Sequence, residues 1–181
     1  MTPGEEESSI HFRHPTVADG AAIWQLVVDA GTLDRNSSYL YLLLCRDFPD
    51  CCVVAERGTS LLGFTTGYRA AARPDTWFLW QVGVAAEARG QGLAKRMVTF
   101  ALGALVPGEV RYLETTVSPS NTASRALFKS IARQFETRLE ESPLFDASLF
   151  PGSEGEHESE PLLRLGPFDP GALKQAGHTL I

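Results

Sequence analysis

The sequence has no run of about twenty apolar residues and no charged-then-apolar leader, so we expect no membrane span and a cytoplasmic location. Positive charge is also scarce, because 16 Lys and Arg residues stand against 22 Asp and Glu residues, for a formal net charge of −6. Nucleic acids and anionic membranes favour a basic protein surface, so we expect neither as a partner. An acidic protein is better suited to a small cationic substrate.

Cysteine and histidine are too few and too scattered to indicate a metal site. Cys45, Cys51 and Cys52 are odd in number and lack the paired spacing of zinc ligands, so we interpret them as buried or idle thiols. Paired ligand spacing is also lacking among the histidines, which are His11, His14, His157 and His178. We therefore expect no metal ion.

The length of 181 residues corresponds to one domain, which can bury most of its apolar surface. Residues 1–9 are acidic and polar, and we predict that they are disordered. We predict that residues 10–168 form a single domain and that residues 169–181 form a C-terminal tail, to which the sequence assigns no role.

The first half of the chain is predicted to contain strands at 10–13, 52–55, 61–68 and 77–84, of which the second and third form a hairpin. A helix is predicted between an N-cap at Asp19 and Gly31. A second helix is predicted at 38–47, with a face built on Tyr39, Leu42, Leu43 and Arg46.

Helices and strands alternate in the second half. We predict a helix from Leu93 to near Pro107, a strand at 111–117, and a helix capped by Asn121 or Ser120. Residues 143–160 are rich in Gly, Pro and acidic residues and are predicted to be a long loop before a last strand at 162–165. This order indicates an α+β fold with a mixed sheet.

The most informative segment joins the strand at 77–84 to the helix that begins at Leu93. Gly90 and Gly92 have no Cβ where the backbone would approach a ligand, and Arg89 adds a cation. The N–H groups of the first helical turn attract an anion, so the segment indicates a pyrophosphate site. An ordinary strand-to-helix loop is the alternative. The spacing differs from that of a nucleotide triphosphate loop, and the preceding strands argue against a dinucleotide fold.

The spacing of Arg89, Gly92 and Ala94 resembles the Gcn5-related N-acetyltransferases, in which this motif holds the pyrophosphate of coenzyme A. The resemblance implies the acyl-CoA N-acyltransferase fold, with a mostly antiparallel sheet of about seven strands flanked by helices. It also implies acetyl-CoA as acetyl donor, bound by Val82, Gly83, Val84, Arg89, Gly90, Gln91, Gly92, Leu93, Ala94, Asn121, Ser124 and Phe128.

Phe128 departs from the family pattern. Many members have a tyrosine there that is thought to protonate the departing thiolate, and phenylalanine has no proton to give. The thiolate must then take its proton from water, from another residue such as Ser124, or from the ammonium formed in the reaction.

Longer motifs resemble the diaminobutyrate acetyltransferases of ectoine biosynthesis over about residues 10–168. They lie at 34–41, 80–82, 111–117 with 119–121, and 149–151 followed by 157–158, and the first and last are the more specific. The resemblance implies acetyl transfer from acetyl-CoA to the side-chain amine of L-2,4-diaminobutyrate. It also implies a homodimer.

This substrate carries ammonium groups and a carboxylate, so its site needs both acceptors and donors. The resemblance implies substrate contacts from Asp34, Tyr39, Trp80, Thr115, His157 and Glu158. We expect direct attack of the neutral amine on a thioester polarised by a backbone N–H from Val82 to Val84. The attack requires a base, for which the candidates are Glu114, Asp34 and His157.

Each of these residues also has a structural interpretation. Without a family, Asp34 is a turn residue, Glu114 a salt-bridge partner, Trp80 a core residue, and 156–158 a solvated acidic loop. Two other functions therefore remain open. One is acetyl transfer to another amine or to a peptide, and the other is a non-catalytic acyl-CoA-binding module, which the missing tyrosine at Phe128 would permit.

Overall fold

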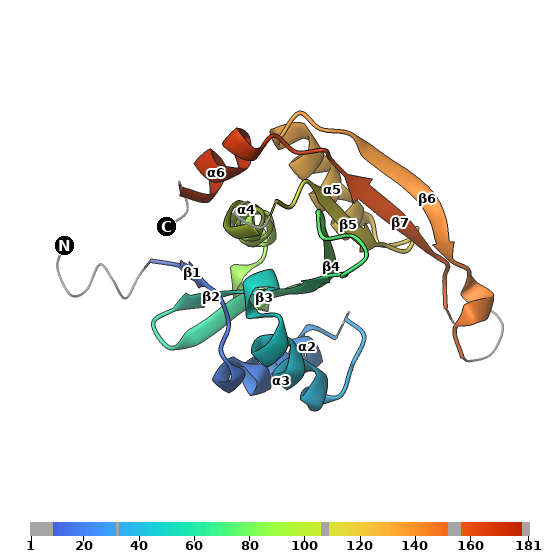
Figure 1. Cartoon of the computed structure of the whole chain (residues 1–181). Helices are drawn as coiled ribbons and strands as arrows, with labels where there is room; N and C mark the ends of the chain where they lie inside the picture. The colour runs from blue at the N-terminus through green and yellow to red at the C-terminus, as the bar shows by residue number, and fades with distance from the viewer. Residues whose placement is uncertain (1–8, 32, 106–108, 152–156, 179–181) are drawn as a thin grey trace.

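The structure, a computed structural model, describes residues 9–31, 33–105, 109–151 and 157–178. Its strands form one seven-stranded sheet in the order β1-β2-β3-β4-β5-β7-β6 (Figure 1). Among the strands of the described residues, β4 and β5 are parallel neighbours and the other pairs are antiparallel. The predicted α+β fold with a mostly antiparallel sheet is confirmed. The strands are β1 (His11–Arg13), β2 (Val53–Arg57), β3 (Ser60–Arg69), β4 (Thr76–Val84), β5 (Tyr112–Thr116), β6 (Leu139–Phe145) and β7 (Glu160–Leu165).

Helices cover both faces of this sheet (Figure 1). The face under α2 and α3 is called the α3 face, and its core centres on Tyr41 and Phe64. The face under α4 and α5 is called the α5 face, and its core includes Met97 and Phe128. The helices are α2 (Gly20–Ala30), α3 (Ser38–Asp47), α4 (Leu93–Leu105), α5 (Thr122–Gln134) and α6 (Pro170–His178).

β4 and β5 separate in the middle of the sheet. Their parallel pairing ends at Phe78 on β4 and Glu114 on β5. Just beyond, β4 has a bulge at Trp80, because Leu79 and Gln81 pair with consecutive residues of β3. In the described part of the chain, the remaining β5-side edge of β4 faces a gap, so backbone N–H groups on that edge are available to a ligand.

Local signals predicted most helix ends correctly. Gly31 ends α2 with a φ of 64°, and α3 has the predicted bounds. Asn121 caps α5, and its side chain accepts a hydrogen bond from the Ser124 N–H at 3.0 Å. Asp19 differs from the prediction, because its carboxylate does not cap α2 and instead accepts hydrogen bonds from Arg13.

The predicted face of α3 is wrong. Tyr39 is 63% exposed, and the helix buries Tyr41, Leu44 and Cys45 instead. Apolar residues occur all round this helix, so spacing alone did not identify the side that packs on the sheet. The cysteines are buried and free, as predicted. Burial raises the pKa of Cys45 to about 11 and that of Cys52 to about 12.

The loop predicted at 143–160 is wrong at both of its ends. β6 extends to Phe145 and therefore includes Pro143, whose missing N–H is tolerated because β6 lies at the edge of the sheet. β7 already begins at Glu160. The predicted C-terminal tail contains α6, which packs against α4. The predicted disorder at 1–9 lies outside the described residues except for Ser9, and the predicted helix end near Pro107 lies outside them as well.

Candidate active site

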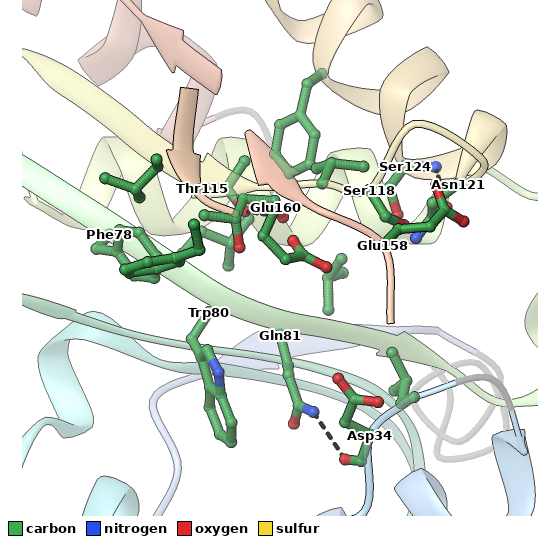
Figure 2. A pocket seen from close by; sticks show the side chains of 18 of the residues that line it. Asp34, Phe78, Trp80, Gln81, Thr115, Ser118, Asn121, Ser124, Glu158 and Glu160 are labelled. Atoms are coloured by element: carbon green, nitrogen blue, oxygen red, sulfur yellow. Dashed lines mark hydrogen bonds between the residues drawn. The ribbon is translucent and has the colours of Figure 1, made fainter. Parts of the chain in front are cut away.

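A cavity of about 970 Å³ lies at the gap between β4 and β5. Its walls come from α5 on one face of the sheet, from α3 and the segment before it on the other, and from the β6–β7 hairpin (Figure 2). It therefore connects the two faces of the sheet. The predicted site residues that line it are Asp34, Trp80, Val82, Thr115, Asn121, Ser124, Phe128, His157 and Glu158.

The first turns of α5 form the wall on the α5 face. Asn121 and Ser124 lie at the start of this helix, where the cap fixes their relative positions. Phe128 follows one turn later and is 2% exposed. Opposite them stands Val82 of β4. This largely apolar wall with a polar rim suits the predicted acyl-CoA arm.

The predicted pyrophosphate site lies between η3 (Ala86–Ala88) and α4. Gly90 and Gly92 have φ values of 75° and 70°, and a Cβ added at either would meet nothing within 4 Å. The Gly92 carbonyl accepts the first helical hydrogen bond of α4, so the next N–H groups lack helical partners and can bind an anion. Exposed Arg89 donates to the Val84 carbonyl through Nε at 3.3 Å, which leaves both Nη groups for a phosphate.

Gln81 fixes the Asp34 segment to the bulge in β4. Its Nε2 donates to the Asp34 carbonyl at 3.1 Å, and its Oε1 accepts from the Tyr41 hydroxyl at 2.8 Å. The Trp24 indole also donates to the Asn36 carbonyl at 3.1 Å. Burial raises the pKa of Tyr41, so its hydroxyl remains a donor. The bond to Asp34 is made to its backbone carbonyl and not to its side chain. The Asp34 carboxylate points into the cavity (Figure 2).

Two more carboxylates reach the cavity from the β6–β7 side. Ser120 hydrogen-bonds to Glu158 through its side chain and through its backbone N–H, the latter at 3.1 Å, and these bonds lower the pKa of Glu158. Glu160 begins β7 and points into the space between Thr115 and Gln81 (Figure 2). Within the described residues, the Glu160 carboxylate has neither a hydrogen bond nor an ion pair, so it can accept from a ligand.

His157 is held with one ring nitrogen available. Its ring stacks on Phe150, with centroids 3.7 Å apart and an interplanar angle of 9°. Its Nδ1 lies 2.6 Å from the Glu158 carbonyl oxygen. A carbonyl oxygen can only accept, so Nδ1 carries the proton and Nε2 is the acceptor.

Glu114 is part of a buried ion-pair cluster. It is 1% exposed, and its carboxylate accepts from Arg73 at 2.5 Å and from Arg164 through the other oxygen. Arg164 also lies over the Tyr112 ring, 3.9 Å from its centroid. The salt-bridge interpretation of Glu114 is confirmed. Its role as a base stays a prediction without support from the cavity, since Arg73 lines the cavity and Glu114 does not.

Four other predicted residues fall into two groups. Thr115 is buried and Trp80 is half-buried beside Tyr41, and both Thr115 and Trp80 line the cavity. Exposed Tyr39 does not line it. Gly83 faces Phe64, and a Cβ there would lie 2.4 Å from that ring, so packing explains this glycine.

Sequence reasoning missed Arg73, Gln81 and Glu160 as cavity residues. The sequence contained a signal for Glu160, because alternate residues of a strand share one face and Glu160 therefore lies on the same face as Leu162 and Arg164. Arg73 and Gln81 had none, because their positions depend on contacts with distant segments. In the described residues, no group of three or more His, Cys, Asp or Glu is placed to hold a metal ion. No helix of the described part is long and apolar enough to cross a membrane.

Comparison with known proteins identifies the family. Residues 20–132 match the model of the acetyltransferase (GNAT) family. The chain is 48% identical over 160 residues to the L-2,4-diaminobutyric acid acetyltransferase of Marinococcus halophilus, covering 88% of this chain and 91% of that relative. It is 45% identical over 168 residues to the protein of that name from Streptomyces coelicolor, covering 91% and 97% respectively.

Solved structures agree with these sequence matches. The diaminobutyrate acetyltransferase EctA of Paenibacillus lautus, in complex with L-2,4-diaminobutyric acid and coenzyme A, has a TM-score of 0.84 at 41% identity, covering 90% of this chain and 97% of its own. Ard1 from Thermoplasma volcanium, at 13% identity and a TM-score of 0.69, covers 87% and 97% and shares the fold. The chain therefore belongs to the acetyltransferase (GNAT) family and, within it, to the diaminobutyrate acetyltransferases.

Proposed function

We propose that this protein transfers the acetyl group of acetyl-CoA to the γ-amine of L-2,4-diaminobutyrate, as in ectoine biosynthesis. The observation that carries the proposal is the cavity at the β4–β5 gap, where a wall formed by α5 meets carboxylates from the Asp34 segment and from the β6–β7 side. The name shared by the relatives and the two ligands of the Paenibacillus lautus structure support the same reaction.

The transfer is direct. The γ-nitrogen attacks the thioester carbonyl carbon, the C–S bond breaks, and coenzyme A leaves as a thiolate. Of the backbone N–H groups of 82–84, those on the edge of β4 that faces the gap polarise the carbonyl oxygen. Cysteine does not act as an acyl carrier, because Cys45, Cys51 and Cys52 are buried and burial raises the pKa of each thiol.

The charges of the cavity fit a diamine. Asp34 and Glu160 point into it from opposite walls, so each can pair with one ammonium group (Figure 2). We assign the γ-amine to Glu160, which lies beside Thr115 at the gap, and the α-ammonium to Asp34. A free amine of this kind has a pKa of about 10.4, so its proton must leave before attack. Glu160 passes that proton to solvent, and His157 Nε2 is a second acceptor.

The thiolate needs a proton source other than Phe128. Ser124 lines the same wall one turn before it and carries a hydroxyl. Water that enters the cavity is the alternative donor. Either source removes the need for the tyrosine that many family members have at this position.

Product analysis tests the reaction and its acceptor together. The enzyme is offered acetyl-CoA with equal concentrations of diaminobutyrate, ornithine and lysine, and the products are resolved by mass spectrometry. We expect acetyl-diaminobutyrate to dominate, and NMR of the product to place the acetyl group on the γ-nitrogen. Preference for ornithine or lysine, or mainly α-acetylation, would return the protein to the wider acetyltransferase class. Absence of coenzyme A release with every amine would favour a binding module.

We also propose a homodimer, located in the cytoplasm and without nucleic-acid or membrane partners. The dimer is supported by apolar side chains on the edge strand β6 and on η5 (Ala147–Leu149). Leu144 and Phe145 are exposed on β6, and Leu149 is 67% exposed on η5. Sedimentation velocity should give about twice the 19.7 kDa of one chain. A concentration-independent mass of one chain would exclude the dimer.

A further inference from the structure

The ion-pair cluster around Glu114 contains more positive than negative charge. One carboxylate accepts from two guanidinium groups, those of Arg73 and Arg164. Arg164 is also held over the Tyr112 ring. The cluster therefore has a surplus of one positive charge, and Arg164 alone would neutralise Glu114. Neutralisation of Glu114 therefore does not explain the presence of Arg73.

Arg73 differs from Arg164 in its surroundings. Its side chain is 50% exposed and lines the cavity, next to Tyr68 and Phe78. The hydrogen bond from Arg73 to Glu114 uses only one of its guanidinium nitrogens, so the rest of this planar donor fork can bind a second anion. Buried Glu114 of β5 accepts a hydrogen bond from Arg73 and fixes the position of its guanidinium group, so Glu114 acts as a positioning residue.

The charges that line the cavity match the charges of the substrate. Asp34, Glu158 and Glu160 are acidic, and His157 presents Nε2 as an acceptor. Among the described lining residues, Arg73 is the one with a permanent positive charge. Diaminobutyrate carries a single carboxylate beside its ammonium groups, and a carboxylate binds best to a planar guanidinium group.

We propose that Arg73 binds the α-carboxylate of diaminobutyrate and thereby selects the γ-amine for acetylation. The inference rests on the proposed function. Arg73 precedes the part of β4 that pairs with β5, whereas the gap that admits the thioester begins after Phe78. A carboxylate held at Arg73 directs the carbon chain towards that gap. The α-amine is on the carbon next to the carboxylate, so it is held away from the thioester with Asp34 as its acceptor, and the γ-amine reaches the thioester.

The test compares diaminobutyrate with 1,3-diaminopropane, which is the same diamine without the carboxylate. Arg73→Gln should lower kcat/KM for diaminobutyrate at least tenfold and change kcat/KM for 1,3-diaminopropane less than twofold. Arg73→Lys should recover part of the loss, because it restores the charge without the planar fork. The product of Arg73→Gln should also contain a larger α-acetyl fraction by NMR. The fold is expected to survive, since Arg164 still pairs with Glu114.

Arg46→Gln is the matched control, because Arg46 is exposed and pairs with the adjacent Asp47. It should leave both kcat/KM values unchanged. If 1,3-diaminopropane reacts too slowly, calorimetric affinities for diaminobutyrate and 2,4-diaminobutanamide in the presence of coenzyme A give the same comparison. Equal losses with both diamines would assign Arg73 a structural role, and no loss would place the carboxylate elsewhere. A wild-type enzyme inactive on diaminobutyrate would instead overturn the proposed function.

Discussion

At the scale of single residues, hydrogen bonding divides the acidic side chains near the cavity into two groups. Glu114 is bound by guanidinium groups on both oxygens, and Glu158 is bound by the Ser120 N–H. In the described residues, the carboxylates of Asp34 and Glu160 have no such partner and face the cavity. A carboxylate that is already satisfied contributes to structure, and one that lacks a partner is available to a cationic substrate.

Glu160→Gln tests this division. It should lower kcat/KM for diaminobutyrate by at least roughly tenfold, because an amide neither attracts the ammonium nor carries its proton. Calorimetry should find the acetyl-CoA affinity unchanged. Glu140→Gln, on the exposed side of neighbouring β6, is the control and should leave turnover as it is. Full activity of Glu160→Gln would shift the proton-transfer role to His157.

Gly92→Ala tests the pyrophosphate site. The φ of 70° at Gly92 strains any side chain, and its Cβ would project into the open space above the start of α4. We expect the acetyl-CoA dissociation constant to rise roughly tenfold, which is about 1.4 kcal/mol. Gly58→Ala is matched for strain, since Gly58 has a φ of 56° and the same open surroundings in the β2–β3 turn. If both variants bind acetyl-CoA equally well, the pyrophosphate lies elsewhere.

At the scale of secondary-structure elements, α6 shows how a segment without a strong motif becomes part of the core. Leu173 of α6 is fully buried in the core of the α5 face, together with Phe168 just before the helix. α4 and α6 approach closely at Gly103 and Gly177, where a Cβ on Gly103 would lie 2.7 Å from the Gly177 Cα. This contact brings two helix backbones together and explains both glycines.

Gly103→Ala should therefore destabilise the protein. The added methyl group has no room against backbone, which costs about 1–3 kcal/mol, and the gain in helix propensity offsets up to about 1 kcal/mol of that cost. Gly171→Ala in α6 is the control, because its Cβ would meet only the Asp169 side chain. Urea unfolding should show a lower midpoint for Gly103→Ala alone. A higher midpoint would mean that α4 and α6 can move apart without cost.

The features that the sequence predicted correctly are set by residues close to one another along the chain. The cap at Asn121, the glycine-bearing turn before α4 and most strands along the chain follow from local residue types, whereas β6 was not predicted. The side on which α3 packs could not be predicted, because apolar residues surround that helix. Arg73 reaches the cavity through its contact with a distant strand, which spacing along the chain does not contain. For Glu160, strand alternation predicts the face on which it lies, but its place in the cavity depends on the pairing of β7 with β5 and β6.

At the scale of the whole molecule, the separation of β4 from β5 opens a gap that connects the two faces of the sheet. The cavity at this gap is lined by the start of α5 on one face of the sheet and by Asp34 and α3 on the other. A donor and an acceptor can therefore bind from opposite faces without competing for space. That arrangement suits direct transfer in a ternary complex, without an acetylated enzyme.

The pH dependence of the whole reaction follows from this arrangement. With an amine pKa of about 10.4, the neutral fraction rises about tenfold per pH unit, so kcat/KM for diaminobutyrate should rise steeply between about pH 6 and 8. The acetyl-CoA affinity should stay flat over that range, because the backbone N–H groups that hold the pyrophosphate do not ionise. Stopped-time assays with a thiol reagent, and calorimetry at each pH, measure the two quantities separately. A flat kcat/KM profile would mean that the ammonium binds charged and gives its proton to a group of the enzyme that keeps it through the attack, which would replace the solvent relay through Glu160 by a true general base.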